Sequence, residues 1–162
     1  MATKTVQSSY VRWQFGQKPG LNQPQFPPDN PLLLTWRLQG SLPPMTHAVS
    51  DKIQKLPGRA RQLRIEKRLD AAKHGPAWLG DARIAPMVCE EIEKGETEFQ
   101  DYKLHAYVVK PNDVHMLVTP TGDFSYFMGK LKGVTARQAN LILGRTGQTF
   151  WQNRSFDRFS RD

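Results

Sequence analysis

The chain has 162 residues, with 23 Lys and Arg against 15 Asp and Glu, which gives a formal net charge of +8 and a pI near 9.8. This length suits a single domain with a real core, and the charge favours a polyanionic partner such as nucleic acid. The single cysteine, Cys89, excludes a disulfide framework and is expected to be a buried core residue. No apolar run approaches the roughly 18 residues of a membrane span, and no signal-peptide pattern opens the chain, so we expect a cytoplasmic protein.

The first third of the chain divides into an arm, a strand and a basic insertion. Residues 1–30 hold Pro19, Pro24, Pro27 and Pro28 among polar residues, which predicts a flexible arm, and residues 31–162 form the folded domain. Residues 31–38 predict a strand. Residues 41–81 follow as an insertion with partial helical periodicity, and residues 52–73 carry eight Lys or Arg against two acids. A solvated helical face and contact with a DNA backbone are equally good interpretations of these charges.

The remaining elements alternate between helix and strand. Residues 82–95 predict a helix with an acidic outer face, with Asp81 as its N-cap and Gly95 as its stop. Strands are predicted at 99–110 and 114–119, and a helix starts near 124. The spacing of a capping box at Thr135 predicts that this helix breaks at Gly133 and restarts. A short strand near 149–152 completes the set.

This order, β-α-β-β-α-β with a hairpin in the middle, predicts an α+β fold of the ferredoxin-like, split β-α-β type. An antiparallel sheet should carry helices on one face, with the basic helical insertion placed after the first strand.

The hairpin at residues 107–120 holds the main candidate site. Asp113 and His115 lie two residues apart just after a Pro-Asn-Asp turn, so their side chains should point to one face of a strand. A carboxylate and an imidazole in this arrangement can share a divalent cation, and the carboxylate favours Mg²⁺ or Mn²⁺. The alternative is an exposed turn aspartate beside a half-buried strand histidine.

Several segments of the sequence around this pair resemble the REP-associated tyrosine transposases, a family of single-tyrosine HUH endonucleases. Besides the hairpin, the resemblance rests on segments spread over residues 31–162, namely 33–43, 76–85, 131–140, Gly147, 150–152 and 156–158. The resemblance implies a mobile-element protein with a ferredoxin-like fold that acts in DNA transposition. It also implies a metal-dependent single-strand endonuclease that acts on hairpin DNA of repetitive palindromes.

Two departures from the family pattern affect catalysis. The first histidine of the metal motif is Asp113 here, so we expect only weak binding of Mg²⁺ or Mn²⁺ at Asp113 and His115. The sequence ends at Asp162, where the family continues into the helix that carries its nucleophilic tyrosine. We therefore expect a C-terminally incomplete domain that does not cleave DNA, with apolar surface exposed near Phe150, Trp151 and Phe156. Tyr126 could approach the metal, although packing is its simpler role.

The DNA contacts are predicted mainly in the last third of the chain, because residues 121–162 hold seven basic residues against three acidic ones. Together with Arg37 on the first strand, the predicted DNA-binding residues are Lys130, Lys132, Arg137, Arg145, Trp151, Arg154 and Arg158. Trp151 belongs to this set as a residue that would stack on a base, although core packing is the favoured alternative.

Three interpretations of the function remain open. The first is an active endonuclease, if the coding sequence continues to a tyrosine. The second is a domesticated protein that binds single-stranded or hairpin DNA, as a monomer or homodimer, without cutting it. The third, an RNA-binding module, lacks the aromatic-rich strand of that class.

Overall fold

The computed structural model describes residues 30–42, 46–71, 75–153 and 156–159, so most of the predicted N-terminal arm lies outside the described residues. The elements, in order, are β1 (Leu32–Arg37), α1 (His47–Gln54), α2 (Gly58–Asp70), a short 3-10 helix η1 (Trp78–Gly80), α3 (Ile84–Thr97), β2 (Tyr102–Val109), β3 (Asp113–Pro120), α4 (Phe124–Ile142) and β4 (Phe156–Phe159). The strands form one sheet in the order β2-β3-β1-β4, and all neighbours are antiparallel.

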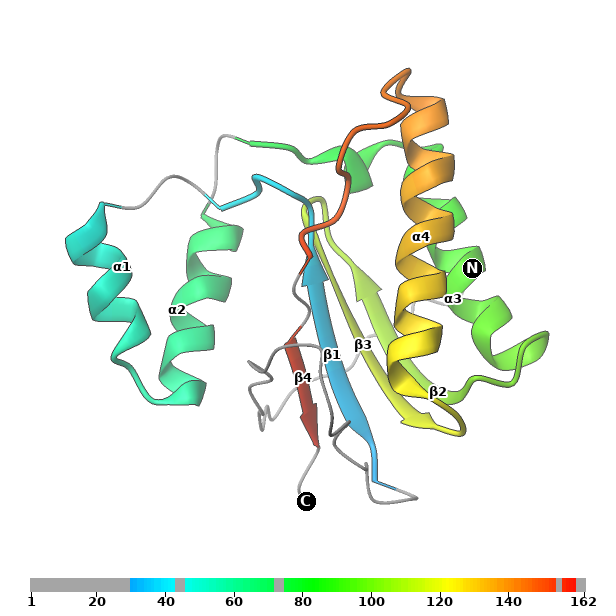
Figure 1. The fold of residues 1–162 in the computed structure, drawn as a ribbon, viewed down its shortest axis with the longest axis horizontal. Coiled ribbons are helices and arrows are strands. Elements are labelled where there is room, and N and C mark those ends of the chain that lie inside the picture. Colours follow the sequence, from blue (N-terminus) through cyan, green and yellow to red (C-terminus); the bar gives the residue numbers. More distant parts are fainter. Residues whose placement is uncertain (1–29, 43–45, 72–74, 154–155, 160–162) are drawn as a thin grey trace.

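This strand order confirms the predicted split β-α-β plan (Figure 1). β3 lies between β1 and β2, which α3 connects, and β1 lies between β3 and β4, which α4 connects. The insertion after β1 is a pair of helices, α1 and α2, which lies beyond the β4 edge of the sheet and apart from α3 and α4 (Figure 1).

The core lies between α3, α4 and one face of the sheet, which we call the helix face. Alternate residues of β1 and β3 supply the sheet side of the core, because successive strand residues point to opposite faces. The fully buried residues of the core include Leu32, Leu34 and Trp36 on β1, Val114, Met116 and Val118 on β3, Ile84, Val88 and Ile92 on α3, and Phe127 and Ala139 on α4. The opposite face of the sheet is called the outer face below.

The predicted ends of α3 were each wrong by two residues, for two physical reasons. Asp81 does not cap the helix directly, because its carboxylate accepts a hydrogen bond from the Arg83 backbone at 2.8 Å and pairs with the Arg83 guanidinium at 2.8 Å. The helix therefore starts at Ile84. Gly95 does not stop the helix, which runs to Thr97; the ring of Tyr102 lies against Gly95, and its hydroxyl donates to the carbonyl of Ile92 at 2.6 Å.

α4 is one uninterrupted helix of 19 residues, so the predicted break at Gly133 was wrong. Thr135 is buried, and its hydroxyl donates back to the carbonyl of Leu131 at 2.7 Å, which is the pattern of a helix interior and not of a cap. The N-cap is Asp123, whose side chain accepts from the backbone of Tyr126.

The last segment also differs from the prediction. Residues 149–152 contribute a single bridge between Leu38 and Trp151, and the fourth strand lies further on, at β4. Phe150 and Trp151 are buried, with exposed fractions of 1% and 5%. The expected apolar surface is therefore absent at these two residues, because their rings pack on one another and on Trp78 and Trp36.

β2 contains a bulge at His105. Leu104 pairs with Val118 and Ala106 with Leu117, so His105 has no pairing partner of its own on β3. The bulge reverses the alternation of side chains, which lets Tyr107 join Leu104 in packing against the core. The His105 ring bonds the hydroxyl of Thr119 at 2.8 Å.

Within the described part of the chain, no helix has both the length and the hydrophobicity needed to cross a membrane.

Candidate nucleic-acid site

The pairing of β1 with β3 collects four polar side chains on the outer face of the sheet. Arg37 lies directly opposite Asp113, and Thr35 lies directly opposite His115. Because residues two apart on a strand share a face, all four point away from α3 and α4. The sequence prediction that Asp113 and His115 share one face is therefore confirmed.

Asp113 and His115 form a closed pair. The Nε2 atom of His115 lies 2.6 Å from Oδ2 of Asp113, and its Nδ1 atom lies 3.1 Å from the hydroxyl oxygen of Thr35. An ionised carboxylate only accepts hydrogen bonds, so Nε2 carries the hydrogen in this pair. Both ring nitrogens are thus occupied, and the two side chains are buried, with residue exposures of 0% for Asp113 and 7% for His115.

Two cations accompany this pair. Lys110 Nζ lies 3.9 Å from Oδ2 of Asp113 and 2.9 Å from Oδ1 of Asp70. Burial works to lower the pKa of Lys110, but the hydrogen bond to Asp70 and the charge of Asp113 raise it overall. Burial lowers the pKa of Arg37 to about 10, while the negative charge of Asp113 opposes this shift.

The side chain of Arg37 is held from the other side as well. Its Nε donates to the side-chain oxygen of Gln152, and the backbone nitrogen of Gln152 donates to the Arg37 carbonyl at 2.9 Å. Arg37 Nη1 and Asp113 Oδ1 are buried and have no hydrogen-bond partner among the described residues. The cluster of Arg37, Lys110, Asp113 and His115 therefore holds two cations against one carboxylate, and Asp70 on Lys110 supplies a second negative charge. One donor and one acceptor are left over.

The donor types at Asp113 and His115 suit a divalent cation, but their arrangement does not fit one as it stands. The carboxylate and the imidazole bond each other, so an ion would have to displace the shared hydrogen. No third His, Cys, Asp or Glu joins them within the described residues, and hard cations need about six ligands. Burial leaves little room for water to supply the others, and two nearby cations would repel the ion. The predicted weak cation binding stays a prediction that this geometry opposes.

Of the described tyrosines, none lies beside the pair. Tyr102 and Tyr107 are held by α3, where their hydroxyls donate to the Ile92 carbonyl and to Glu93 at 2.6 and 2.7 Å. Tyr126 is 66% exposed in the first turn of α4. That turn follows the far end of β3, about 23 Å from Asp113 at roughly 3.3 Å per strand residue, and α4 covers the other face of the sheet.

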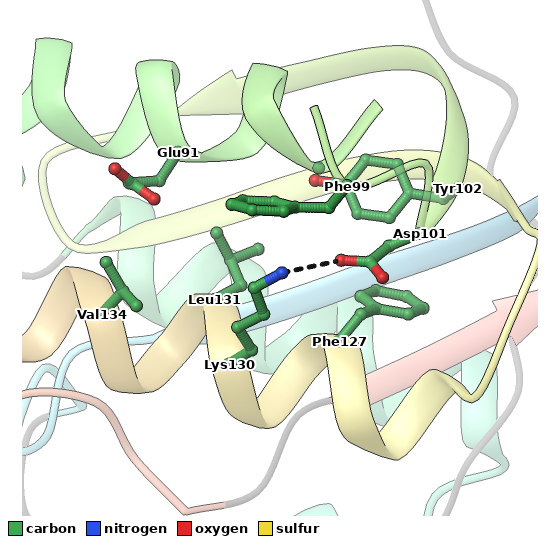
Figure 2. A pocket seen from close by; sticks show the side chains of 9 residues that line it. Glu91, Phe99, Asp101, Tyr102, Phe127, Lys130, Leu131 and Val134 are labelled. Carbon is green, nitrogen blue, oxygen red and sulfur yellow. Dashed lines mark ion pairs between the residues drawn. The ribbon is translucent and has the colours of Figure 1, made fainter. Parts of the chain in front are cut away.

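The predicted DNA contact Lys130 is engaged within the protein (Figure 2). Its Nζ lies 3.5 Å from Oδ2 of Asp101 and 3.1 Å from the centre of the Phe99 ring. These residues border a small pocket between α3 and α4 of about 50 Å³, which is far below the size of a ligand site. Lys130 therefore stabilises the contact between α4 and the segment that connects α3 to β2.

Lys132, Arg145 and Trp151 also have structural contacts. Lys132 donates to the backbone carbonyls of Gln152 and Asn153. Arg145 lies 3.7 Å above the ring of Trp78 and donates to the side chain of Gln148. Trp151 donates its indole hydrogen to Thr135 at 2.9 Å. Base stacking by Trp151 is contradicted, because its ring is buried.

The remaining predicted contacts are Arg137, Arg154 and Arg158. Arg137 lies on α4 and is the one exposed member of the predicted set among the described side chains. Arg154 lies outside the described residues. Arg158 lies in β4, where its backbone pairs with that of Leu33 in β1.

Sequence reasoning missed Thr35 and Lys110, although both had a detectable signal. Thr35 and Arg37 repeat on the first strand the two-residue spacing of Asp113 and His115, which indicates two polar pairs on adjacent strands. Lys110 precedes the Pro-Asn turn by one residue, so the turn returns Asp113 to its side.

Cys89 is half-buried, not fully buried as predicted. Burial raises the pKa of its thiol, although the neighbouring hydroxyl of Tyr107 works to lower it.

The solved structures that are similar to this chain include two of transposases. One is a REP-associated tyrosine transposase bound to a REP hairpin, with a TM-score of 0.47 and 16% identity over 96% of this chain and 64% of that one. The other is a candidate transposase from Deinococcus radiodurans, with a TM-score of 0.40 and 15% identity over 88% of each chain. The chain thus spans less than two thirds of the length of the first. The sequence matches no protein-family model and no curated protein.

Proposed function

We propose that this protein is a transposase-like DNA-binding protein that holds single-stranded or hairpin DNA and does not cleave it. The observation that carries the binding is the uneven distribution of its net charge of +8. α3 gathers four glutamates against one lysine, so most of the remaining surface is left with a larger positive excess. Such a field attracts phosphate backbones and raises the rate of association.

The absence of cleavage is proposed from the cluster around Asp113. Phosphodiester cleavage through a tyrosine needs a nucleophile and a group that stabilises the developing charge, both close to one phosphate. His115 is already bonded on both ring nitrogens, and Tyr126 lies at the far end of the sheet on the other face. The cluster is better suited to stabilise the ends of β1 and β3 than to run this reaction.

Weak binding of Mg²⁺ or Mn²⁺ at Asp113 and His115 forms a separate part of the proposal. Oδ1 of Asp113 is free, and an ion that also took His115 would have to displace the hydrogen that the two side chains share. Binding at this cost beside two cations should be weak, and no step of the proposed function depends on it.

An RNA-binding module of the ferredoxin-like type is not favoured by any observation. Such modules stack bases on aromatic residues of the two central strands. Here β3 has no Phe, Tyr or Trp, its His115 is buried, and the single aromatic of β1, Trp36, is buried on the helix face.

The test combines binding with a search for a covalent product. The full chain is titrated into labelled hairpin, single-stranded and duplex DNA, with anisotropy as the readout. We expect binding whose logarithm falls linearly with the logarithm of salt concentration, at about 0.7 per phosphate contact on single strands. Absence of binding to all three probes at low salt would overturn the function.

The same mixtures, with Mn²⁺ or Mg²⁺ added, are then run on a denaturing gel. We expect intact DNA and no adduct. A protein–DNA adduct would contradict the non-catalytic part of the proposal, and variants of single tyrosines to phenylalanine, Tyr126→Phe first, would identify the nucleophile.

A further inference from the structure

The pair of helices α1 and α2 carries a dense positive charge, and we call it the basic hairpin. Residues 47–71 hold seven basic residues against three acids. The basic residues are Lys52, Lys55, Arg59, Arg61, Arg64, Lys67 and Arg68, and the acids are Asp51, Glu66 and Asp70. The hairpin therefore supplies a large share of the net charge from a small part of the chain.

The two acids of α2 do not compensate the outward charges. Glu66 accepts a hydrogen bond from the amide of Gln62 at 2.5 Å, and Gln62 is buried. Asp70 is paired with Lys110 of the β2–β3 hairpin at 2.9 Å. Within the described residues, no ion pair joins Arg64 or Lys67 to an acid, so their charge is available to an outside anion.

The geometry of α2 places these two residues on its exposed side. Gln62 and Leu69 are its buried residues, and at 100° per residue Arg64 and Lys67 lie on the opposite side of the helix. Both are exposed, and Leu63 beside them is 48% exposed. Like charges three residues apart on a helix repel each other. The stability of the hairpin therefore does not explain why Arg64 and Lys67 lie together on the exposed side of α2.

The base of the hairpin is fixed next to the cluster around Asp113. The side chain of Asn112 donates to the carbonyl of Leu69 at 3.0 Å, and Lys110 bonds Asp70. Arg61 joins the two helices by donating to the carbonyls of Gln54 and Leu56. The basic hairpin lies beyond the β4 edge of the sheet (Figure 1). It is attached to the rest of the fold at the turn that leads into β3.

We propose that the basic hairpin is a principal phosphate-binding surface of this protein and that Arg64 and Lys67 contact the DNA backbone. The inference rests on the proposed function and moves the expected DNA contacts from the last third of the chain to the insertion. Lys130 and Lys132 are engaged by Asp101 and by backbone carbonyls, whereas Arg64 and Lys67 have no acid partner among the described residues.

The test compares two variants of equal net charge in the full chain. The first is Arg64→Gln/Lys67→Gln. The control is Arg83→Gln/Lys103→Gln, which removes two exposed basic residues from the start of α3 and from the far edge strand β2. Circular dichroism and urea unfolding are measured for both variants to check that each remains folded.

Loss of two phosphate contacts should reduce the slope of log affinity against log salt concentration by about 1.4 on single-stranded DNA. At 0.1 M salt this change corresponds to roughly 25-fold weaker binding. The control should change both quantities much less. If the wild type binds DNA and the two variants behave alike, the placement on the hairpin is overturned while the proposed function stands. If the wild type binds no DNA, the proposed function itself fails. Tighter binding to RNA of the same sequence would overturn DNA as the partner.

Discussion

The contact between Gly95 and Tyr102 provides the most direct check on the packing of α3 against β2. A Cβ atom added at Gly95 would lie 2.0 Å from the Tyr102 hydroxyl oxygen, 2.3 Å from Cζ and 2.7 Å from Cε1. These distances are too short for any pair of non-bonded heavy atoms, and the ring is itself buried at 3% exposure. The substitution Gly95→Ala must therefore displace the ring.

The cost can be assembled from separate contributions. Alanine is about 1 kcal/mol better than glycine in a helix interior. Overpacking costs about 1–3 kcal/mol, and a displaced Tyr102 loses its hydrogen bond to Ile92, which contributes about 0.5–1.5 kcal/mol. Its contact with the Phe127 ring, with centroids 5.0 Å apart, contributes a similar amount. The expected net loss in the free energy of unfolding is about 1–5 kcal/mol.

Urea unfolding measures this loss, and Gly133→Ala is the matched control. Gly133 lies in the interior of α4 with nothing within 4 Å of an added Cβ, so its replacement should stabilise the protein by about 1 kcal/mol. A double-mutant cycle of Gly95→Ala with Tyr102→Leu should show strong coupling, because the smaller side chain leaves room for the methyl group. Stabilisation by Gly95→Ala to the level of the control would refute the packing argument.

Three further predictions concern the hydroxyl of Tyr102 and the pair on the outer face. Burial raises the pKa of Tyr102 above its ordinary value of 10.0, so the unfolded chain releases this proton first and stability should fall as pH rises past about 10; Tyr102→Phe should reduce this alkaline loss, and an unchanged urea midpoint profile from pH 9 to 11 would contradict it. Asp113→Asn should lower the free energy of unfolding by roughly 1.5–3 kcal/mol, because Arg37 and Lys110 lose their buried counter-charge; a variant as stable as the wild type in urea would rule out this role. Calorimetry with Mn²⁺ should show weak binding that His115→Ala removes, and Asp113→His should bind softer ions more tightly; equal Mn²⁺ binding by wild type and His115→Ala would exclude the site.

Sequence patterns predicted the order of the elements well, because the apolar residues of β1, β3 and α3 follow the periods of a strand and a helix. The errors fall at single residues whose role depends on the partner across the core. A glycine is typical of the end of a helix, but Gly95 lies inside α3, and a larger residue does not fit there because the ring of Tyr102 lies against it. Thr135 has the spacing of a cap, but its hydroxyl is needed by the buried indole of Trp151.

The candidate site was predicted in part for a related reason. The two-residue spacing of Asp113 and His115 is a local property of one strand, so their common face could be read from the sequence. That the two side chains bond each other, with Thr35 on the second ring nitrogen, follows from the register between β1 and β3, which no local pattern specifies. Lys130, Lys132 and Arg145 illustrate the same limit. Their charge is visible in the sequence, while their partners Asp101, Gln152 and Gln148 are not.

The bulge at His105 bears on how this protein tolerates changes in chain length. Upstream of it, Tyr102 and Leu104 face the helices, and downstream Tyr107 and Val109 do so. Deletion of His105 alone would leave these four in regular alternation, so β2 should accept the loss of this residue with little more than the bond to Thr119 removed. A deletion on either side, at Lys103 or Val108, would instead shift part of the strand by one place and turn core residues outward. We therefore expect β2 to tolerate the deletion of one residue at His105 but not at Lys103 or Val108.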